Sequence, residues 1–235
     1  MKKLINPTVI TNFIIVFLIV GVSIVGFLPE KTAFVSSDND IKAIYNGNRD
    51  KKQVSLMFNV YENTQVVNAI IDELNSRNLK ATFFVGGCWA DDNGETLVKM
   101  AESGHEIANH GYFHKDHKKL NYQKNYEEIK LSSAIVKALS GVETTLFAPP
   151  SGSFSQDTLV ASFNLGHKLI MWSKDTIDWR DKDKNKIFDR ATKGITNGDL
   201  VLMHPKTHSL EVLPRILDYY DSLGLQQVTV SQNLL

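Results

Sequence analysis

The sequence predicts an α/β barrel of seven strand-and-helix units, preceded by one transmembrane helix. Seven short apolar runs rich in β-branched and aromatic residues alternate with longer segments that have the apolar spacing of a helix. Repeated units of this kind form a parallel sheet with right-handed connections, and seven strongly apolar strands favour a barrel. An uncharged apolar segment at the N-terminus is long enough to cross a bilayer.

The N-terminal segment is the first predicted element. It carries no charged residue from Leu4 to Pro29, and a bilayer is crossed by roughly 20 residues. Lys2 and Lys3 precede it, so the positive-inside rule places the N-terminus in the cytoplasm and the domain outside the membrane. A cleaved signal peptide is the alternative. We expect an uncleaved anchor at residues 1–30, because the run is long and no clear cleavage site follows it.

A linker and one domain follow the anchor. Residues 31–51 contain the polar runs SSDND and NGNRD, which are typical of a linker. In the domain, residues 52–235, the apolar runs predict strands at 53–60, 81–87, 106–111, 145–150, 168–175, 199–205 and 226–231. Amphipathic helices are expected between them, for example over residues 66–74 and 210–217.

The composition restricts the kinds of partner and metal site. The 26 basic and 26 acidic side chains cancel, and no basic stripe is interleaved with aromatic residues, which argues against nucleic acid as a partner. A neutral polymer or a small molecule is favoured instead. Cys88 is the single cysteine, so no cysteine cluster can hold a metal. Any metal must be bound by histidines and carboxylates.

Histidines and aspartates collect where the predicted strands end, which is where parallel α/β barrels carry their reactive residues. His110 and His114 are four residues apart and could bind one metal if their loop curls back. His204 ends an apolar strand, and Asp175 and Asp178 follow another. Each of these alone is more often structural. Their common position at one rim predicts a functional site.

The motifs that contain these residues resemble the NodB-homology polysaccharide deacetylases, carbohydrate esterase family four. The family motifs T-F-D-D-G, H-S/T-x-x-H, R-x-P-x-G, D-x-x-D-W and L-x-H read here, in the same order, MFNVYEN, HGYFH, APPSG, DTIDW and LMH. The resemblance covers residues 52–235, and the sequence looks most like the sporulation-associated branch. It implies a distorted (β/α) barrel. It also implies a divalent metal, commonly zinc, that serves hydrolysis of N-acetyl groups in GlcNAc- or MurNAc-containing glycans such as peptidoglycan.

The resemblance implies a role for each matching residue. His110 and His114 would be metal ligands, and His204 would be the general acid that protonates the leaving amine. A histidine with a carboxylate partner suits this role, and Asp175 or Asp178 would orient and charge-stabilise it. The substrate-binding residues would be Leu202, which lines the acetyl pocket, Trp179, which walls the site, Pro150 and Gly152.

The first motif departs from the family at its reactive positions. The general base falls on Asn59, which cannot take a proton at ordinary pH, and the third metal ligand falls on Val60. The sporulation branch has an Asp two positions after the Asn, where this chain has Tyr61. Glu62 is the next carboxylate, and we expect it to be the third ligand while Asn59 orients the attacking water. The alternative is a solvated Glu62 at a helix start.

Other differences leave two functions open. Ala148 replaces an Arg that pairs with the catalytic Asp, which is consistent with Asn59 because an unpaired buried guanidinium is costly. Ser151 replaces a usual Tyr, and Asp116 and His117 are substitute ligands or, more simply, the start of a helix. We expect a membrane-anchored de-N-acetylase with a degenerate first motif. A pseudoenzyme that binds glycan or a wall-assembly partner is the alternative.

Overall fold

The computed structural model describes residues 41–235. The predicted anchor at residues 1–30 and residues 31–40 of the predicted linker lie outside the described residues. The described residues belong to one compact unit, Asp40–Leu235. Within residues 41–235, every helix is too short or too polar to cross a bilayer.

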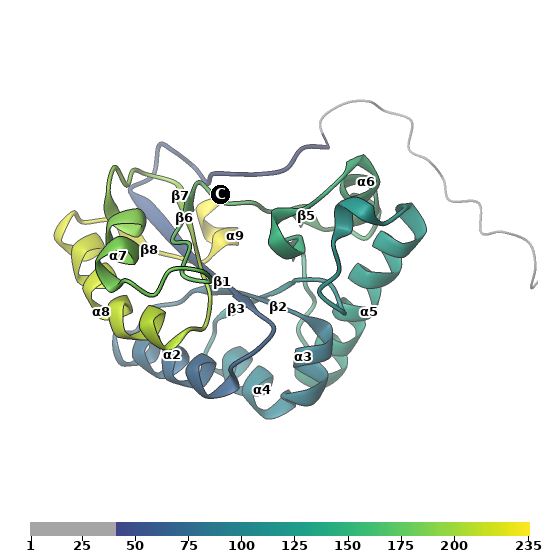
Figure 1. Cartoon of the computed structure of the whole chain (residues 1–235), viewed down its shortest axis with the longest axis horizontal. Helices are drawn as coiled ribbons and strands as arrows, with labels where there is room; N and C mark the ends of the chain where they lie inside the picture. The colour runs from purple at the N-terminus through teal and green to yellow at the C-terminus, as the bar shows by residue number, and fades with distance from the viewer. Residues whose placement is uncertain (1–40) are drawn as a thin grey trace, which may run out of the picture. The chain divides into compact units, whose positions relative to one another are not determined.

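A curled parallel sheet of eight strands forms the centre of the described domain (Figure 1). The strand order is β5-β4-β3-β2-β1-β7-β6, and β8 pairs with β1. The strands are β1 (Gln53–Val60), β2 (Thr82–Val85), β3 (Glu106–Asn109), β4 (Leu146–Phe147), β5 (Lys168–Leu169), β6 (Lys174–Asp175), β7 (Asp199–Met203) and β8 (Gln226–Gln227). The predicted parallel α/β architecture is confirmed.

Helices surround the outer face of this sheet (Figure 1). They are α2 (Thr64–Ser76), α3 (Gly87–Asp92), α4 (Gly94–Glu102), α5 (Tyr122–Ser140), α6 (Gln156–Asn164), α7 (Lys184–Thr192) and α8 (Thr207–Ser222). The short helix α9 (Val230–Asn233) packs instead inside the curl of the sheet, where Val230 joins the cluster that contains Met57. There are also short 3₁₀ turns, η1 (His117–Lys119) and η2 (Pro150–Gly152). Asn121 caps α5 and Asp183 caps α7 through their side-chain oxygens, as expected for these residue types.

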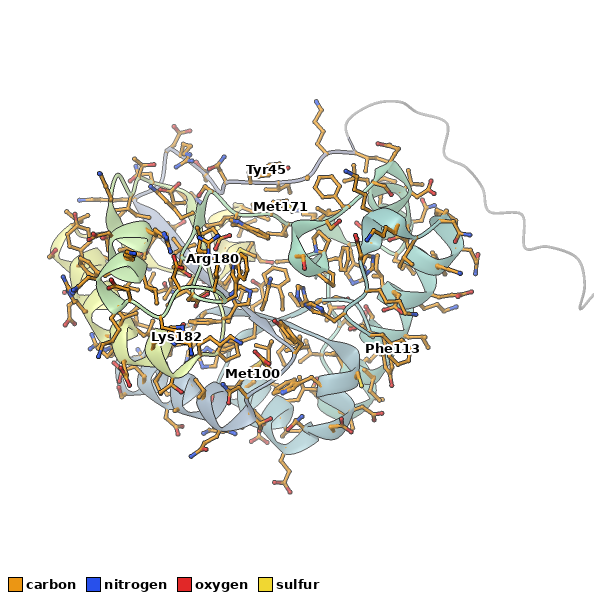
Figure 2. The ribbon with its side chains drawn as sticks, in the orientation of Figure 1. Tyr45, Met100, Phe113, Met171, Arg180 and Lys182 are labelled. Atoms are coloured by element: carbon orange, nitrogen blue, oxygen red, sulfur yellow. The ribbon has the colours of Figure 1, made fainter. Side chains whose placement is uncertain are left out.

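The barrel is not closed by regular strand pairing. The predicted strand 168–175 is in fact two short strands, because β5 pairs with β4 at one edge of the sheet and β6 pairs with β7 at the other. Residues 44–46 bridge this seam: Ile44 lies parallel to Ile170, and the Met171 N–H donates to the Ile44 carbonyl at 2.7 Å. Tyr45 and Met171 lie together there (Figure 2). The folded domain therefore begins before residue 52.

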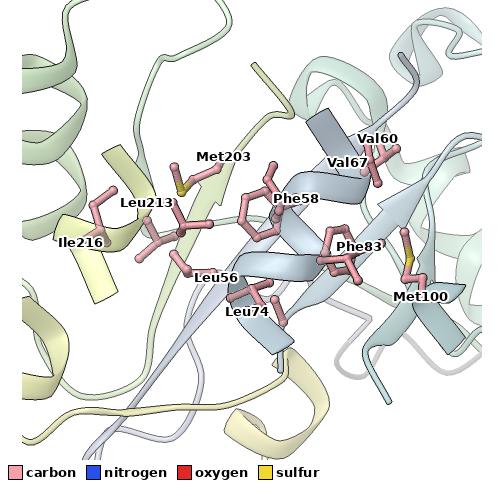
Figure 3. Close-up of a cluster of buried hydrophobic side chains, with 14 of the residues drawn as sticks. Leu56, Phe58, Val60, Val67, Leu74, Phe83, Met100, Met203, Leu213 and Ile216 are labelled. Carbon is pink, nitrogen blue, oxygen red and sulfur yellow. The ribbon is translucent and has the colours of Figure 1, made fainter. Parts of the chain in front are cut away.

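The two faces of β1 have different surroundings. Leu56, Phe58 and Val60 belong to the large hydrophobic cluster between the sheet and its helices (Figure 3). Met57 belongs to a second cluster, inside the curl of the sheet, together with Leu202 of β7. Because side chains alternate along a strand, Asn59 shares the inner face with Met57, whereas Val60 points toward the helices. Val60 is therefore a core residue and does not face the candidate site.

Candidate functional site

His204 and Asp178 form a buried pair at the carboxyl end of the sheet. His204 directly follows β7, and Asp178 lies in the loop after β6. The Nδ1–H of His204 donates to Oδ1 of Asp178 at 2.8 Å, and its backbone N–H donates to Oδ2 at 2.8 Å. The Ser209 hydroxyl donates to the same Oδ2 at 2.6 Å. Both carboxylate oxygens are thus occupied, and Nε2 of His204 is the ring nitrogen left for a substrate.

The charge of Asp178 is stabilised by these hydrogen bonds. Burial acts to raise the pKa of Asp178, but the bonds from His204 and Ser209 outweigh burial and lower that pKa below its ordinary value. The carboxylate is therefore ionised at neutral pH, and it holds the imidazole in the tautomer that carries hydrogen on Nδ1. His208 donates from Nε2 to the backbone carbonyl of Asp178 at 2.8 Å and fixes the loop.

Asp175 has a different place from Asp178. Its Oδ1 accepts the backbone N–H of Ile177 at 2.8 Å, and Ile177 has a positive φ of 55°. This hydrogen bond from side chain to backbone makes a turn after β6, and the turn places Asp178 next to His204. Of the two aspartates expected to support His204, Asp178 bonds to its ring. Asp175 does not, and stabilises the turn instead.

His110 and His114 lie next to each other in the loop after β3, with ring centroids 5.2 Å apart. The Nδ1–H of His110 donates to the Ala148 carbonyl at 2.7 Å, so its Nε2 carries no hydrogen. That Nε2 is buried and has no hydrogen-bond partner. Burial lowers the pKa of both histidines, and the neighbouring His204 lowers it further, so both rings are neutral at pH 7.

Glu128 shapes this histidine loop and was not predicted from the sequence. From α5 its Oε2 accepts the backbone N–H groups of Tyr112 and Phe113, at 3.0 and 2.8 Å. Its Oε1 pairs with Lys115 at 2.8 Å. The loop also needs Gly111, whose φ is 74° and where a Cβ would lie 2.8 Å from Nε2 of His117. No motif marks Glu128; its only signal is an acidic residue on the buried face of a helix.

The proposed substitute ligands have structural contacts instead. His117 is fully buried, and its Nδ1 bonds to Oδ1 of Asn125 at 2.7 Å. Asp116 accepts a hydrogen bond from Ser153 at 2.6 Å and pairs with Lys119. Asp116 therefore begins the turn η1, as the simpler interpretation expected, but His117 is a core residue and is not solvated.

The first motif places the Asn59 amide and the Tyr61 phenol at the site, whereas the Glu62 carboxylate is paired elsewhere. Asn59 is 2% exposed, and its Oδ1 is buried without a partner. The Tyr61 ring lies against His114, with centroids 4.1 Å apart. Glu62, the expected third metal ligand, forms an ion pair with Lys206. Glu62 is the first carboxylate after Asn59 in the sequence, and it is held by Lys206, in the loop after β7.

The histidine pair fits a divalent metal, whereas the third ligand is not in position. A buried, neutral and unbonded Nε2 beside a second neutral histidine is the donor set that such an ion takes. Catalytic zinc sites usually have three protein ligands. In the part of the chain that the structure describes, no three His, Cys, Asp or Glu side chains are grouped to hold a metal. Glu62 would have to leave Lys206 to complete the set.

The expected substrate-binding residues differ in exposure. Leu202 and Pro150 are buried, and Leu202 packs in the inner hydrophobic cluster. Trp179 is 52% exposed, with the Arg180 guanidinium 5.5 Å from its ring centroid. Gly152 has a φ of 64°, and a Cβ there would lie 2.7 Å from the Trp172 ring, so the turn η2 requires glycine.

Comparison with known proteins identifies the family. Residues 46–170 match the family model described as polysaccharide deacetylase. The chain is 33% identical to "Uncharacterized protein YlxY" of Bacillus subtilis over 80% of this chain and 59% of that protein. It is 30% identical to "Peptidoglycan-N-acetylmuramic acid deacetylase PdaC" of Bacillus subtilis over 78% of this chain and 39% of that protein. The chain thus spans less than two thirds of the length of these relatives.

A solved structure is also similar. The crystal structure of BA3943 from Bacillus anthracis, described as a CE4 family pseudoenzyme, aligns with a TM-score of 0.81 and 28% identity over 84% of this chain and 70% of that chain. A mutant of the same protein is described as having restored enzymatic activity. The chain belongs to the polysaccharide deacetylase family, in which named peptidoglycan deacetylases and a pseudoenzyme are both found among its relatives.

Proposed function

We propose that the domain removes N-acetyl groups from a cell-wall glycan such as peptidoglycan, on the outer side of a membrane to which residues 1–30 anchor it. The single observation that carries the proposal is the buried His204 and Asp178 pair. An amide does not release its amine unless the nitrogen is protonated, and a histidine oriented by a carboxylate is suited to supply that proton.

In this mechanism the imidazolium form of His204, which Asp178 stabilises, donates its Nε2 proton to the leaving amine. Asn59 orients the attacking water through its unbonded Oδ1 but takes no proton from it, and the proton that the water loses passes to the solvent. His110 and His114 would hold a divalent metal, zinc in our proposal, and Glu62 would join them after leaving Lys206. When bound, such a metal supplies Lewis-acid activation of the amide and lowers the pKa of water to roughly 7.

A glycan-binding protein without hydrolytic activity is the second candidate. It is favoured by the absence of a carboxylate at residues 59 to 61 and by the engagement of Glu62 with Lys206. The similarity to a protein described as a pseudoenzyme supports it as well. The hydrolytic function, by contrast, predicts slow acetate release, because the base is missing at Asn59 and loss of a positioned base costs roughly 10² to 10⁴ in rate.

Acetate release from N-acetylated chitotetraose and from peptidoglycan, measured with zinc, tests the proposal. We expect slow release by the wild type and none above background by His204→Ala. Lys137→Ala is the control, because Lys137 lies on the surface of α5 and pairs only with the exposed Glu143 among the contacts described. Equal release by wild type and His204→Ala would exclude the hydrolytic function and leave glycan binding as the alternative.

A further inference from the structure

A pocket of about 470 Å³ lies on the outside of the domain, where α7 and α8 pack side by side (Figure 1). Its lining comes from the loop before α7, from the first residues of α7 and from one face of α8. The same loop carries Asp178, and the same helix carries Ser209, which donates to Asp178. The pocket is therefore built on the two elements that support His204, but it contains none of these three residues.

Arg215 is held in this pocket without a carboxylate partner. Its guanidinium lies over the Phe188 ring, 3.8 Å from the centroid, and its Nη1 donates to Oδ1 of Asn185 at 3.0 Å. Every other arginine in the described part of the chain forms an ion pair, namely Arg49 with Asp199, Arg77 with Glu73 and Asp218, and Arg180 and Arg190 with Asp181. Arg215 is thus a cation that is fixed in position and still able to bind an anion.

The other charges of the pocket have both signs. Lys182 lines it from the loop before α7 (Figure 2) and forms no ion pair within the described residues. Lys184 pairs with Glu211 at 3.0 Å, and Asp183 accepts the backbone N–H of Asn185 at 2.9 Å. The two carboxylates oppose the entry of a polyanion but attract an ammonium group. The pocket therefore suits a ligand that carries a carboxylate and an amino group together.

We propose that this pocket binds a short peptide through one of its carboxylates, which pairs with Arg215 and Lys182. The planar guanidinium matches a carboxylate with two parallel hydrogen bonds, and the acidic side chains of the pocket attract the amino group of the same peptide. The volume lies within the range of roughly 300 to 1,000 Å³ for small-molecule pockets, so it suits a ligand larger than a single ion. The inference rests on peptidoglycan as the proposed substrate and specifies it, because the peptides of that polymer would be recognised together with its glycan.

Calorimetry with the full chain tests this site. The ligands are soluble peptidoglycan fragments that carry their peptides, the same fragments with the peptide carboxylates amidated, and fragments from which an amidase has removed the peptides. We expect the first to bind severalfold more tightly than the other two. Arg215→Gln should weaken its binding about three- to tenfold, between the effects typical of an exposed ion pair and of a hydrogen bond to a charged group. Lys182→Ala should weaken it less, since this lysine is not fixed by a ring.

Arg77→Gln is the matched control and should leave binding unchanged. Arg77 is also a partly exposed arginine, but it lies outside the pocket and pairs with Glu73 and Asp218. Equal binding of peptide-bearing and amidated fragments, or equal binding by wild type and Arg215→Gln, would overturn the site. Acetate release that depends on His204 would leave the proposed function standing in that case. Binding that depends on Arg215, without any acetate release, would support the site and contradict hydrolysis.

Discussion

The two sides of the candidate site differ in how many of their buried polar atoms form hydrogen bonds. On the acid side, formed by Asp178, His204 and Ser209, both carboxylate oxygens accept hydrogen bonds. On the metal side, Oδ1 of Asn59 and Nε2 of His110 are buried without partners. A buried polar atom left unbonded costs roughly 1–3 kcal/mol. The acid side is therefore complete within the protein, whereas the metal side requires something that the protein does not supply.

This difference indicates which part of the chemistry the fold retains. The acid side depends on contacts between the loops after β6 and β7 that also stabilise the domain. The metal side has no carboxylate at residues 59 to 61, and the next one along the chain, Glu62, is paired with Lys206.

Activity should depend most strongly on the acid side. We expect Asp178→Asn to lower acetate release by roughly 10²- to 10⁴-fold, because the amide no longer holds His204 in the required tautomer or stabilises its charge. The pH profile should change with the rate, since His204 loses its carboxylate partner. Acetate assays from pH 5 to 9 measure both effects. An unchanged rate and profile would mean that His204 does not act as the acid.

Stability should distinguish the carboxylates of the two sides. Asp178→Ala leaves three buried donors of His204 and Ser209 without an acceptor, and an unsatisfied buried donor costs about 1–3 kcal/mol, so the free energy of unfolding should fall by at least that amount. The Glu62 and Lys206 side chains are 43% and 23% exposed, and Glu62→Ala should cost about 0–1 kcal/mol. Urea denaturation measures both values. Similar losses in the two variants would contradict the proposed difference in burial and bonding.

As the pH falls, the metal side should lose its contribution to stability at a higher pH than the acid side does. Burial lowers the pKa of His110 well below its ordinary value, so below about pH 6.5 the unfolded chain binds a proton that the folded chain does not. The free energy of unfolding therefore falls as the pH drops below 6.5. Burial opposes the lowering of the Asp178 pKa, but its hydrogen bonds prevail, and its stabilisation is lost only below about pH 3.9.

The pH prediction is tested by urea denaturation from pH 7 to pH 3. His110→Asn should reduce the loss of stability between pH 7 and pH 4, whereas Asp178→Asn should remove the part of the loss below pH 4 that belongs to its carboxylate. If the His110→Asn profile runs parallel to that of the wild type over the whole range, the buried neutral state of His110 is wrong.

Zinc affinity should respond weakly to the ion pair on the metal side. If Glu62 is a ligand, Lys206 competes with zinc for it, and this partly exposed pair is worth about 0.2–1 kcal/mol. Lys206→Met should then tighten zinc binding by about 1.4- to 5-fold. Glu62→Gln should weaken it and abolish the effect of Lys206→Met. Equal zinc content in wild type and Glu62→Gln would exclude Glu62 as a ligand.

Local patterns in the sequence predicted most of the sheet but not its seam. The predicted strand 53–60 coincides with β1, because its buried run is rich in apolar, β-branched and aromatic residues. The run 168–175 was also predicted as one strand, yet it crosses between opposite edges of the sheet. That crossing depends on Ile44, which lies more than a hundred residues earlier in the chain. Pairing at this distance leaves no local signal.

The site shows the same limit. Motif spacing predicted His110, His114 and His204 as site residues, and the structure places them near one another, but the spacing could not choose between Asp175 and Asp178. That choice depends on a positive φ at Ile177, a residue type with no preference for it. Nor could the sequence show that Glu62 meets Lys206, since this contact joins two loops at different strand ends. The membrane anchor stays a prediction.

The central claim is that the missing carboxylates, and not the acid side, limit hydrolysis. The direct measurement is acetate release from N-acetylated chitotetraose, with zinc, by wild type and by the double variant Asn59→Asp, Tyr61→Asp. We expect a rise of roughly 10²- to 10⁴-fold as a base returns beside the histidine pair. Val60→Asp, which places its carboxylate in the core, should unfold the domain without any gain. A folded, zinc-bound double variant that is no faster than wild type would contradict the account.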